Sequence, residues 1–162
     1  MKKLLSAALI SMFIVFAVSA NAGPIEDSVA AYDRKDYVTA AKLMRVAADQ
    51  GNALAQFNLG FMYEQGQGVT QDYKEAVKWY RLSADQGYAS AQNNLGLMYD
   101  KGQGVTQDYA RAHMWLNISA SSGHKNAEAN RNIVAKKMTQ TQIEKAQEMA
   151  RLCMKTNYKN CD

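Results

Sequence analysis

Apolar residues in the middle of the chain follow a helical period in two neighbouring stretches. Residues 53–64 and 73–86 both place apolar side chains three or four positions apart, which predicts two amphipathic helices. A short turn rich in glycine separates them. The residues expected on the inner faces are Ala55, Leu59, Met62 and Tyr63 in the first helix, and Ala76, Trp79, Tyr80 and Ser83 in the second.

The pair of predicted helices occurs twice. Residues 52–87 recur as residues 88–123 at an offset of 36 with no gap, and 21 of the 36 positions are identical. A period between 20 and 50 residues is typical of solenoids, whose units bury their apolar faces by stacking on one another. The sequence therefore predicts an all-α solenoid of antiparallel helix pairs. Such an architecture favours a binding scaffold over a catalyst.

Most of the repeated residues have an expected structural role. Glycines after each first helix allow a turn with positive φ, and Asp72 is a suitable N-cap, with Glu75 completing a capping box. Glycine and alanine inside the helices predict close helix contacts, and the tryptophans are expected to fill the space between units. The structural set comprises Leu59, Gly60, Tyr63, Gly66, Gly68, Asp72, Ala76, Trp79 and Gly87, and then Leu95, Gly96, Tyr99, Gly102, Gly104, Asp108, Ala112, Trp115 and Gly123.

The ends of the repeat region are atypical. Residues 25–51 match the second half of a unit but lack the Gly-x-Gly turn, so we expect a partial first repeat. Residues 124–137 continue the pattern as a degraded first helix. Thr139 and Gln142 form a capping-box pattern ahead of a last helix over 140–155, which we expect to cap the solenoid with one apolar face. The repeat domain is thus predicted to cover residues 23–162.

The first 22 residues have the pattern of a secretory signal peptide. Lys2 and Lys3 precede an apolar run from Leu4 to Val18, and Ala20-Asn21-Ala22 is a small-x-small cleavage site. We expect cleavage after Ala22. The pattern is typical of signal peptides from Gram-negative bacteria, so the mature protein is expected in the periplasm or secreted. The alternative is an uncleaved membrane anchor, for which the run is short. No cysteine follows the run, which argues against a lipid anchor.

Charge excludes some classes of partner. The net charge is +4, and without Lys2 and Lys3 there remain 17 basic and 15 acidic residues, mixed along the chain. Nucleic-acid binding would need a clustered basic face, so it is not expected. No second apolar stretch is long enough for a membrane span, and we expect a monomer without stable membrane insertion.

Two cysteines lie near the C-terminus. Because an exported protein meets an oxidising compartment, we expect a disulfide between Cys153 and Cys161. Such a bond would hold the end of the chain against the last helix. A metal or redox pair is the alternative, but the spacing is not C-x-x-C and no histidine is nearby.

The repeat resembles a known family. The pattern Ala-x3-Leu-Gly-x2-Tyr-x2-Gly-x-Gly-Val-x2-Asp-x3-Ala-x2-Trp-x4-Ala-x2-Gly runs over 55–87 and again over 91–123. It is similar to the Sel1-like repeat, a relative of the tetratricopeptide repeat. The resemblance implies a right-handed α-solenoid whose first helices line a concave groove, and a role as an adaptor. A cysteine-rich branch associated with β-lactam binding has a disulfide in every repeat, and neither full repeat here contains a cysteine.

The resemblance also implies which residues face the groove. Those expected to contact a partner are Leu54, Phe57, Phe61, Gln65, Asn93, Leu97 and Lys101, with Glu64, Ser90, Asp100, Asn126, Ala129, Ile133 and Lys137 on the same faces. Phe57 and Phe61 differ from Asn93 and Leu97 at the matching positions, so stacking does not require an aromatic ring there. They are therefore the preferred peptide anchors. The alternative is that they pack against the N-terminal unit.

No catalytic or metal-binding pattern is evident. The two histidines, His113 and His124, are isolated, and His113 is expected on the surface because it lies off the tryptophan stripe. Gly66-Gln67-Gly68 is not followed by the Gly-Lys-Ser/Thr of a phosphate-binding loop and is read as a structural turn. We expect no cofactor and no enzyme activity.

The leading hypothesis is an exported scaffold that binds a peptide or an envelope protein in its groove. One alternative is an enzyme acting on the cell wall or on β-lactams, in which a carboxylate or a serine would be the catalytic group. Another is a secreted effector that meets host proteins through the same surface. The identity of the partner does not follow from the sequence.

Overall fold

A computed structural model describes residues 23–159 and 161. The predicted signal peptide lies outside the described residues. The described part is helical and contains no strand. Its helices are α1 (Pro24–Asp33), α2 (Tyr37–Asp49), α3 (Ala53–Gln65), α4 (Tyr73–Ala84), α5 (Ala89–Lys101), α6 (Tyr109–Ser121), α7 (Ala127–Ala135) and α8 (Gln140–Lys155).

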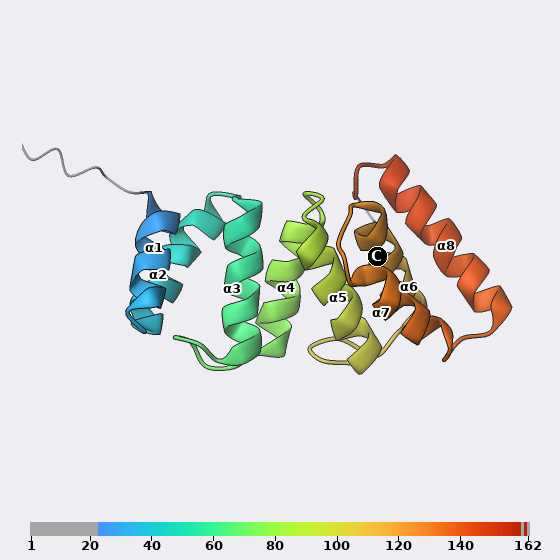
Figure 1. Ribbon diagram of the computed structural model, residues 1–162, viewed down its shortest axis with the longest axis horizontal. Helices are drawn as coiled ribbons and strands as arrows, with labels where there is room; N and C mark the ends of the chain where they lie inside the picture. The colour runs from blue at the N-terminus through green and yellow to red at the C-terminus, as the bar shows by residue number, and fades with distance from the viewer. Residues whose placement is uncertain (1–22, 160, 162) are drawn as a thin grey trace, which may run out of the picture.

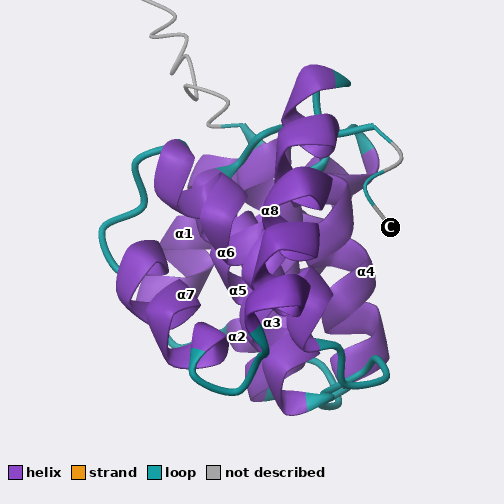
Figure 2. Cartoon of the chain, turned by 90° about the vertical axis from the view of Figure 1, so that its right-hand side faces the viewer, coloured by secondary structure: helices purple, strands orange, loops and turns teal. Residues whose placement is uncertain are grey.

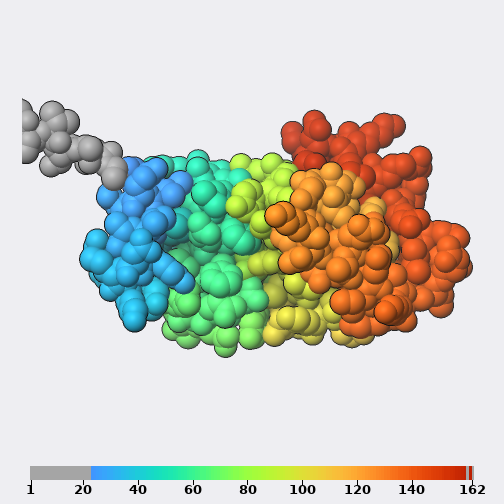
Figure 3. Space-filling view, in the orientation of Figure 1, coloured from blue at the N-terminus to red at the C-terminus, as the bar shows by residue number. Residues whose placement is uncertain are grey.

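The helices form a row of pairs. Helices α1 and α2, α3 and α4, and α5 and α6 pack as successive units, and each unit packs on the next (Figure 1). We call α1, α3, α5 and α7 the A helices, and α2, α4 and α6 the B helices. The space-filling view shows the units packed in one continuous row from α1 to α8 (Figure 3). The protein is an all-α solenoid, as predicted.

Local signals in the repeat position the helix ends. The carboxylate of Asp72 accepts hydrogen bonds from the backbone N–H groups of Lys74 and Glu75, at 2.9 and 3.1 Å. Gly66 has φ of +67° and ends α3, and Gly102 has φ of +66° and ends α5. These bonds and glycines satisfy helix termini that would otherwise expose unpaired backbone groups.

Glycines inside the A helices lie where another helix passes close by. A Cβ added to Gly60 would lie 2.8 Å from the ring of Tyr80, and one added to Gly96 would lie 2.7 Å from Leu116. Trp79 and Trp115 are buried in the two hydrophobic clusters of the core. Small residues therefore allow close helix approach, and the large rings fill the space between the helices.

The second glycine of each turn connects neighbouring units. A Cβ on Gly68 would overlap the backbone carbonyl of Tyr37, and one on Gly104 would overlap that of Tyr73. Each Gly-x-Gly turn thus lies directly on the start of the preceding B helix. Only glycine permits this contact at positive φ.

The last helix does not pair with α7. Instead α8 packs on α6 and buries Ala146, Ala150 and Cys153, and the end-on view shows α7 and α8 on different sides of the solenoid end (Figure 2). The capping box of Thr139 and Gln142 starts the helix. The final unit is therefore not a helix pair like the others.

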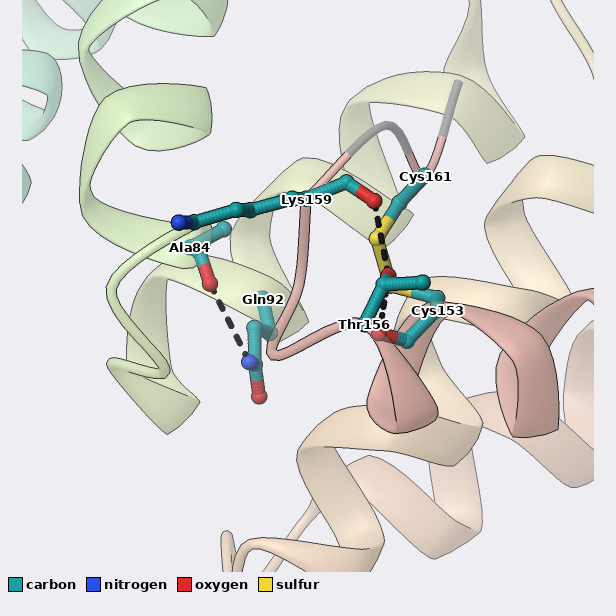
Figure 4. Close-up of a disulfide and its surroundings, with 6 residues drawn as sticks. All are labelled: Ala84, Gln92, Cys153, Thr156, Lys159 and Cys161. Carbon is teal, nitrogen blue, oxygen red and sulfur yellow. Dashed lines mark hydrogen bonds between the residues drawn. A yellow bond between two sulfur atoms is a disulfide. The ribbon is translucent and has the colours of Figure 1, made fainter.

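A disulfide joins Cys153 to Cys161, with the two Cα atoms 4.9 Å apart. The tail that it closes runs beside the turn between α4 and α5 (Figure 4), and a Cβ on Gly87 would lie 2.9 Å from the ring of Tyr158. A disulfide closing so short a loop contributes about 2–3 kcal/mol by loop entropy. Here it also holds an aromatic side chain against the middle of the solenoid.

The surface position expected for His113 is wrong. Its side chain is buried in α6, where the equivalent residue of the preceding unit is Val77, also buried. Packing of α8 and α7 on α6 covers this face of the helix. The repeat itself carried a signal for this burial, because the equivalent position holds the apolar and buried Val77.

Candidate functional site

The exposed side of the A helices carries most of the residues predicted to bind a partner. We call this surface the A face. Leu54, Phe61 and Gln65 of α3 and Lys101 of α5 are exposed there, and Leu97 is half-buried. The A face is therefore the surface on which a candidate binding site is sought.

Phe57 does not occupy the position expected of it. Its ring packs against Tyr80 and Tyr88, with ring centroids 5.8 and 5.2 Å apart. It is neither an open anchor nor a contact to the N-terminal unit, because it fills the junction of α3 with α4 and the start of α5. This leaves Phe61 as the exposed aromatic residue among the predicted contacts of α3.

Asn93 also differs from expectation, because it is only 5% exposed. Its Nδ2 donates to Oδ1 of Asn94 at 3.2 Å, and its Oδ1 accepts from Nδ2 of Asn130 at 2.9 Å. Asn93 thus links α5 to α7. Close by, Lys137 and Asp100 form an ion pair of 2.7 Å, so two further predicted face residues bind each other.

One apolar residue per A helix lies at the same register of the A face. Phe61, Leu97 and Ile133 are 36 residues apart. Ser28 donates to the carbonyl of Ala40 at 2.8 Å. Gly60 lies against the equivalent carbonyl, that of Ala76, so the next residue of α1, Val29, corresponds to Phe61. We call Val29, Phe61, Leu97 and Ile133 the apolar row.

A second row consists of asparagines. Asn58, Asn94 and Asn130 are also 36 residues apart and half-buried, three positions before the members of the apolar row. A side-chain amide offers both donors and an acceptor, as a peptide unit does. We call these three residues the asparagine row. It was not identified from the sequence, although its 36-residue spacing is visible there.

A buried tyrosine supports the asparagine row. The hydroxyl of Tyr80 donates to Oε2 of Glu64 at 2.5 Å, and Tyr80 is also hydrogen-bonded to Asn94. Burial and the Glu64 carboxylate raise the pKa of Tyr80 far above its ordinary value of 10, so the hydroxyl keeps its proton and acts as a donor. The network fixes the orientation of Asn94 from beneath.

A pocket of about 250 Å³ opens between α1, α2 and α3 at one end of the apolar row. Its lining is mainly apolar, and Val29 and Phe61 contribute side chains that are 49% and 38% exposed. We call it the α1–α3 pocket. Its lining residues are Ser28, Val29, Tyr32, Met44, Asn58, Phe61 and Met62.

The pocket was only partly predictable. Phe61 was identified because it differs between the two full repeats. Packing of Phe61 against the N-terminal unit was the alternative interpretation, but the residues of α1 involved were not identified, because the partial first unit has no second copy with which they can be compared. Val29 and Tyr32 of α1 are exposed and line the pocket together with Phe61.

The buried His113 predicts a dependence of stability on pH. Its pKa lies below the ordinary value of 6.5, because burial disfavours the charged imidazolium and the Arg131 guanidinium repels it. Between the lowered pKa and about 6.5 the unfolded chain binds more protons, so stability decreases as the pH falls through this window. We expect His113→Val, which restores the residue of the preceding unit, to flatten the dependence of the unfolding free energy between pH 7 and 5, measured in urea.

The other histidine provides the control. His124→Asn is expected to retain the slope of the wild-type protein over the same range. An unchanged slope in His113→Val would contradict the assignment of the pH dependence to His113.

Among the described residues, no group of three His, Cys, Asp or Glu side chains comes together to hold a metal ion. Within residues 23–159, no helix is both long and apolar enough to cross a membrane. The A face carries the apolar row, the asparagine row and the α1–α3 pocket, and it is the surface from which a function is proposed.

Comparison with known proteins agrees with this architecture. The family model for the Sel1 repeat matches three times, at residues 31–52, 53–88 and 89–124. The comparison with curated proteins found no match.

Among the solved structures similar to this chain are two repeat proteins. The chain is 30% identical to a protective antigen present in uropathogenic Escherichia coli strains that displays an SLR fold, with a TM-score of 0.79 over 85% of this chain. It is 29% identical to a Sel1 repeat protein from Oxalobacter formigenes, with a TM-score of 0.67 over 79% of this chain. The matches span 30% and 55% of those longer chains. The chain belongs to the Sel1 repeat family.

Proposed function

We propose that this protein is an exported scaffold that binds a segment of a partner protein along its A face. Sel1 repeat proteins are commonly scaffolds for protein–protein interaction and are typically not enzymes. The apolar row carries the proposal for this chain. Val29, Phe61 and Ile133 are exposed and Leu97 is half-buried, while the tryptophans and alanines fill the interior, so stacking does not account for the row.

The two rows together match an extended segment. An extended chain advances about 3.3 Å per residue, and every second side chain faces the same side. A segment crossing the A helices could place an apolar side chain on each member of the apolar row. Its backbone could then exchange hydrogen bonds with the asparagine row, as amide groups do in strand pairing.

Export is part of the proposal. The sequence pattern of residues 1–22 supports it, as does the description of the Escherichia coli relative as a protective antigen. Mass spectrometry of the protein recovered from the periplasm or the medium tests it. A mature chain that starts at Gly23 is expected, and a chain found only uncleaved in the cytoplasm would contradict export.

Selection of random 12-residue peptides displayed on phage tests the binding surface directly. Peptides enriched on the purified protein are expected to lose about tenfold or more in affinity when Phe61→Ser removes an apolar anchor. Val46→Ser is the matched control, since Val46 is 47% exposed but lies on α2. If the enriched peptides keep their affinity when Phe61, Val29 and Leu97 are substituted, binding along the A face is contradicted.

A further inference from the structure

The α1–α3 pocket has the size of a site for one side chain. Its volume of about 250 Å³ is below the ~300–1,000 Å³ of pockets that hold small-molecule ligands. Met44 and Met62 are buried residues that contribute to its lining, and Val29 and Phe61 flank its opening. Ser28, the buried polar residue of the lining, already donates its hydroxyl proton to Ala40. An apolar side chain therefore fits the interior better than a polar one.

Two carboxylates share the face of α1 on which Val29 lies at the pocket. Glu26 lies three residues before Val29 and Asp33 lies four residues after it, so all three share one face of the helix. Both carboxylates are exposed, and that of Glu26 lies beside Gly23 at the start of α1. Among the described residues neither has an ion-pair partner.

The next cations along the chain, Arg34 and Lys35, form no ion pair with these carboxylates among the described residues. Arg34 lies close enough to Asp36 to contribute to lowering its pKa. Lys35 follows the end of α1 in the turn toward α2, with φ of +62°. On α3, the residue three positions after Phe61 is Glu64, but its carboxylate accepts a hydrogen bond from Tyr80 of α4. The acidic side chains beside the pocket that carry the argument are thus those of α1.

We propose that the α1–α3 pocket takes one large apolar side chain of the bound segment, and that Glu26 and Asp33 select lysine or arginine within two positions of it. The inference rests on the proposed binding along the A face and adds the chemistry of the segment. In an extended chain, residues two positions before and after the anchor lie on the same side as the anchor. The two carboxylates are seven residues apart, or about 10 Å along the helix, which long basic side chains can span.

Fluorescence anisotropy with three synthetic peptides tests this inference. The peptide SKTLTKS carries an apolar anchor with basic neighbours, SETLTES reverses the charges, and SKTSTKS lacks the anchor. We expect SKTLTKS to bind the wild-type protein about fivefold more tightly than SETLTES, as two exposed ion pairs provide. SKTSTKS is expected to show no measurable binding.

Charge reversal of the protein completes the test. In the double variant Glu26→Lys/Asp33→Lys, the preference for SKTLTKS is expected to disappear or reverse. Asp27→Lys is the matched control, because Asp27 is exposed on the same helix but lies two residues from Val29 and hence on another face. It is expected to keep the preference.

Three outcomes would overturn the inference. If SKTLTKS and SETLTES bind equally and both weaken in Phe61→Ser, the charge selection is wrong while binding along the A face stands. If Asp27→Lys abolishes the preference as fully as the double variant, the effect is general electrostatics. If neither peptide binds, the pocket does not accept such a segment, and the phage selection decides separately on the A face.

Discussion

Replacing Gly104 by alanine is expected to cost the protein about 2–5 kcal/mol of its unfolding free energy. Gly104 has φ of +73°, and left-handed backbone costs about 1–2 kcal/mol for a residue with a Cβ. The new methyl group would also overlap the carbonyl carbon and oxygen of Tyr73. These are backbone atoms that cannot rotate away, so the turn after α5 has to move off the start of α4.

A substitution at Gly123 separates the cost of the left-handed backbone from the cost of the overlap with the neighbouring unit. Its φ is +85°, but a Cβ there would meet nothing within 4 Å. Gly123→Ala is therefore expected to lose only the conformational term, about 1–2 kcal/mol. Urea unfolding followed by circular dichroism at 222 nm measures both. Equal losses in the two variants would show that the contact between neighbouring units is not what requires glycine at position 104.

The features predicted well from the sequence are those that depend on local chemistry and occur twice. Gly66 and Gly102 end helices, and Asp72 and Asp108 cap them, because each needs only its neighbours in the chain. Two copies with the same residues distinguish such requirements from chance. The exposed Phe61 was instead identified by a difference between the copies, because Leu97 occupies the equivalent position in the next unit.

Features that depend on distant segments were not predicted. Phe57 packs on Tyr88, which belongs to the following unit, so its burial depends on how the units stack. Helix α1 completes the pocket although its unit is too divergent for comparison. In both cases the deciding contact lies outside the repeat that contains the residue. His113 is different, because the buried Val77 at the same register of the preceding unit could have indicated its position.

Some contacts between residues far apart in the chain can nevertheless be predicted from the two full repeats, residues 52–87 and 88–123. Gln56 donates to the carbonyl of Ala48, and Gln92 donates to that of Ala84 at the equivalent place. Ser83 and Ser119 likewise reach the carbonyls of Ala53 and Ala89, both at 2.7 Å. Buried polar residues that are identical in both copies thus indicate hydrogen bonds to the backbone, since an unpaired buried amide or hydroxyl would be costly.

Replacing Trp115 by alanine is expected to lower the unfolding free energy by about 3–5 kcal/mol, as for other fully buried large side chains. Trp115 is 0% exposed and belongs to the hydrophobic cluster that joins α4, α5 and α6 to α7 and α8. Truncation leaves a cavity at this junction that the surrounding helices can fill only in part. Leu152→Ala is the control, because Leu152 is 51% exposed on α8 and its loss is expected to cost well under ~1.5 kcal/mol.

The position of Trp115 also predicts which helices lose protection from hydrogen exchange in the Trp115→Ala variant. In a solenoid each unit contacts only its neighbours, so stability is distributed along the row. Hydrogen exchange of Trp115→Ala is expected to show lost protection in α6, α7 and α8 while α1, α2 and α3 stay protected. Peptide binding at the α1–α3 pocket should then survive, although binding that extends to Ile133 should weaken. Uniform loss of protection along the chain would show instead that the solenoid unfolds as one cooperative unit and that the pocket depends on the far end.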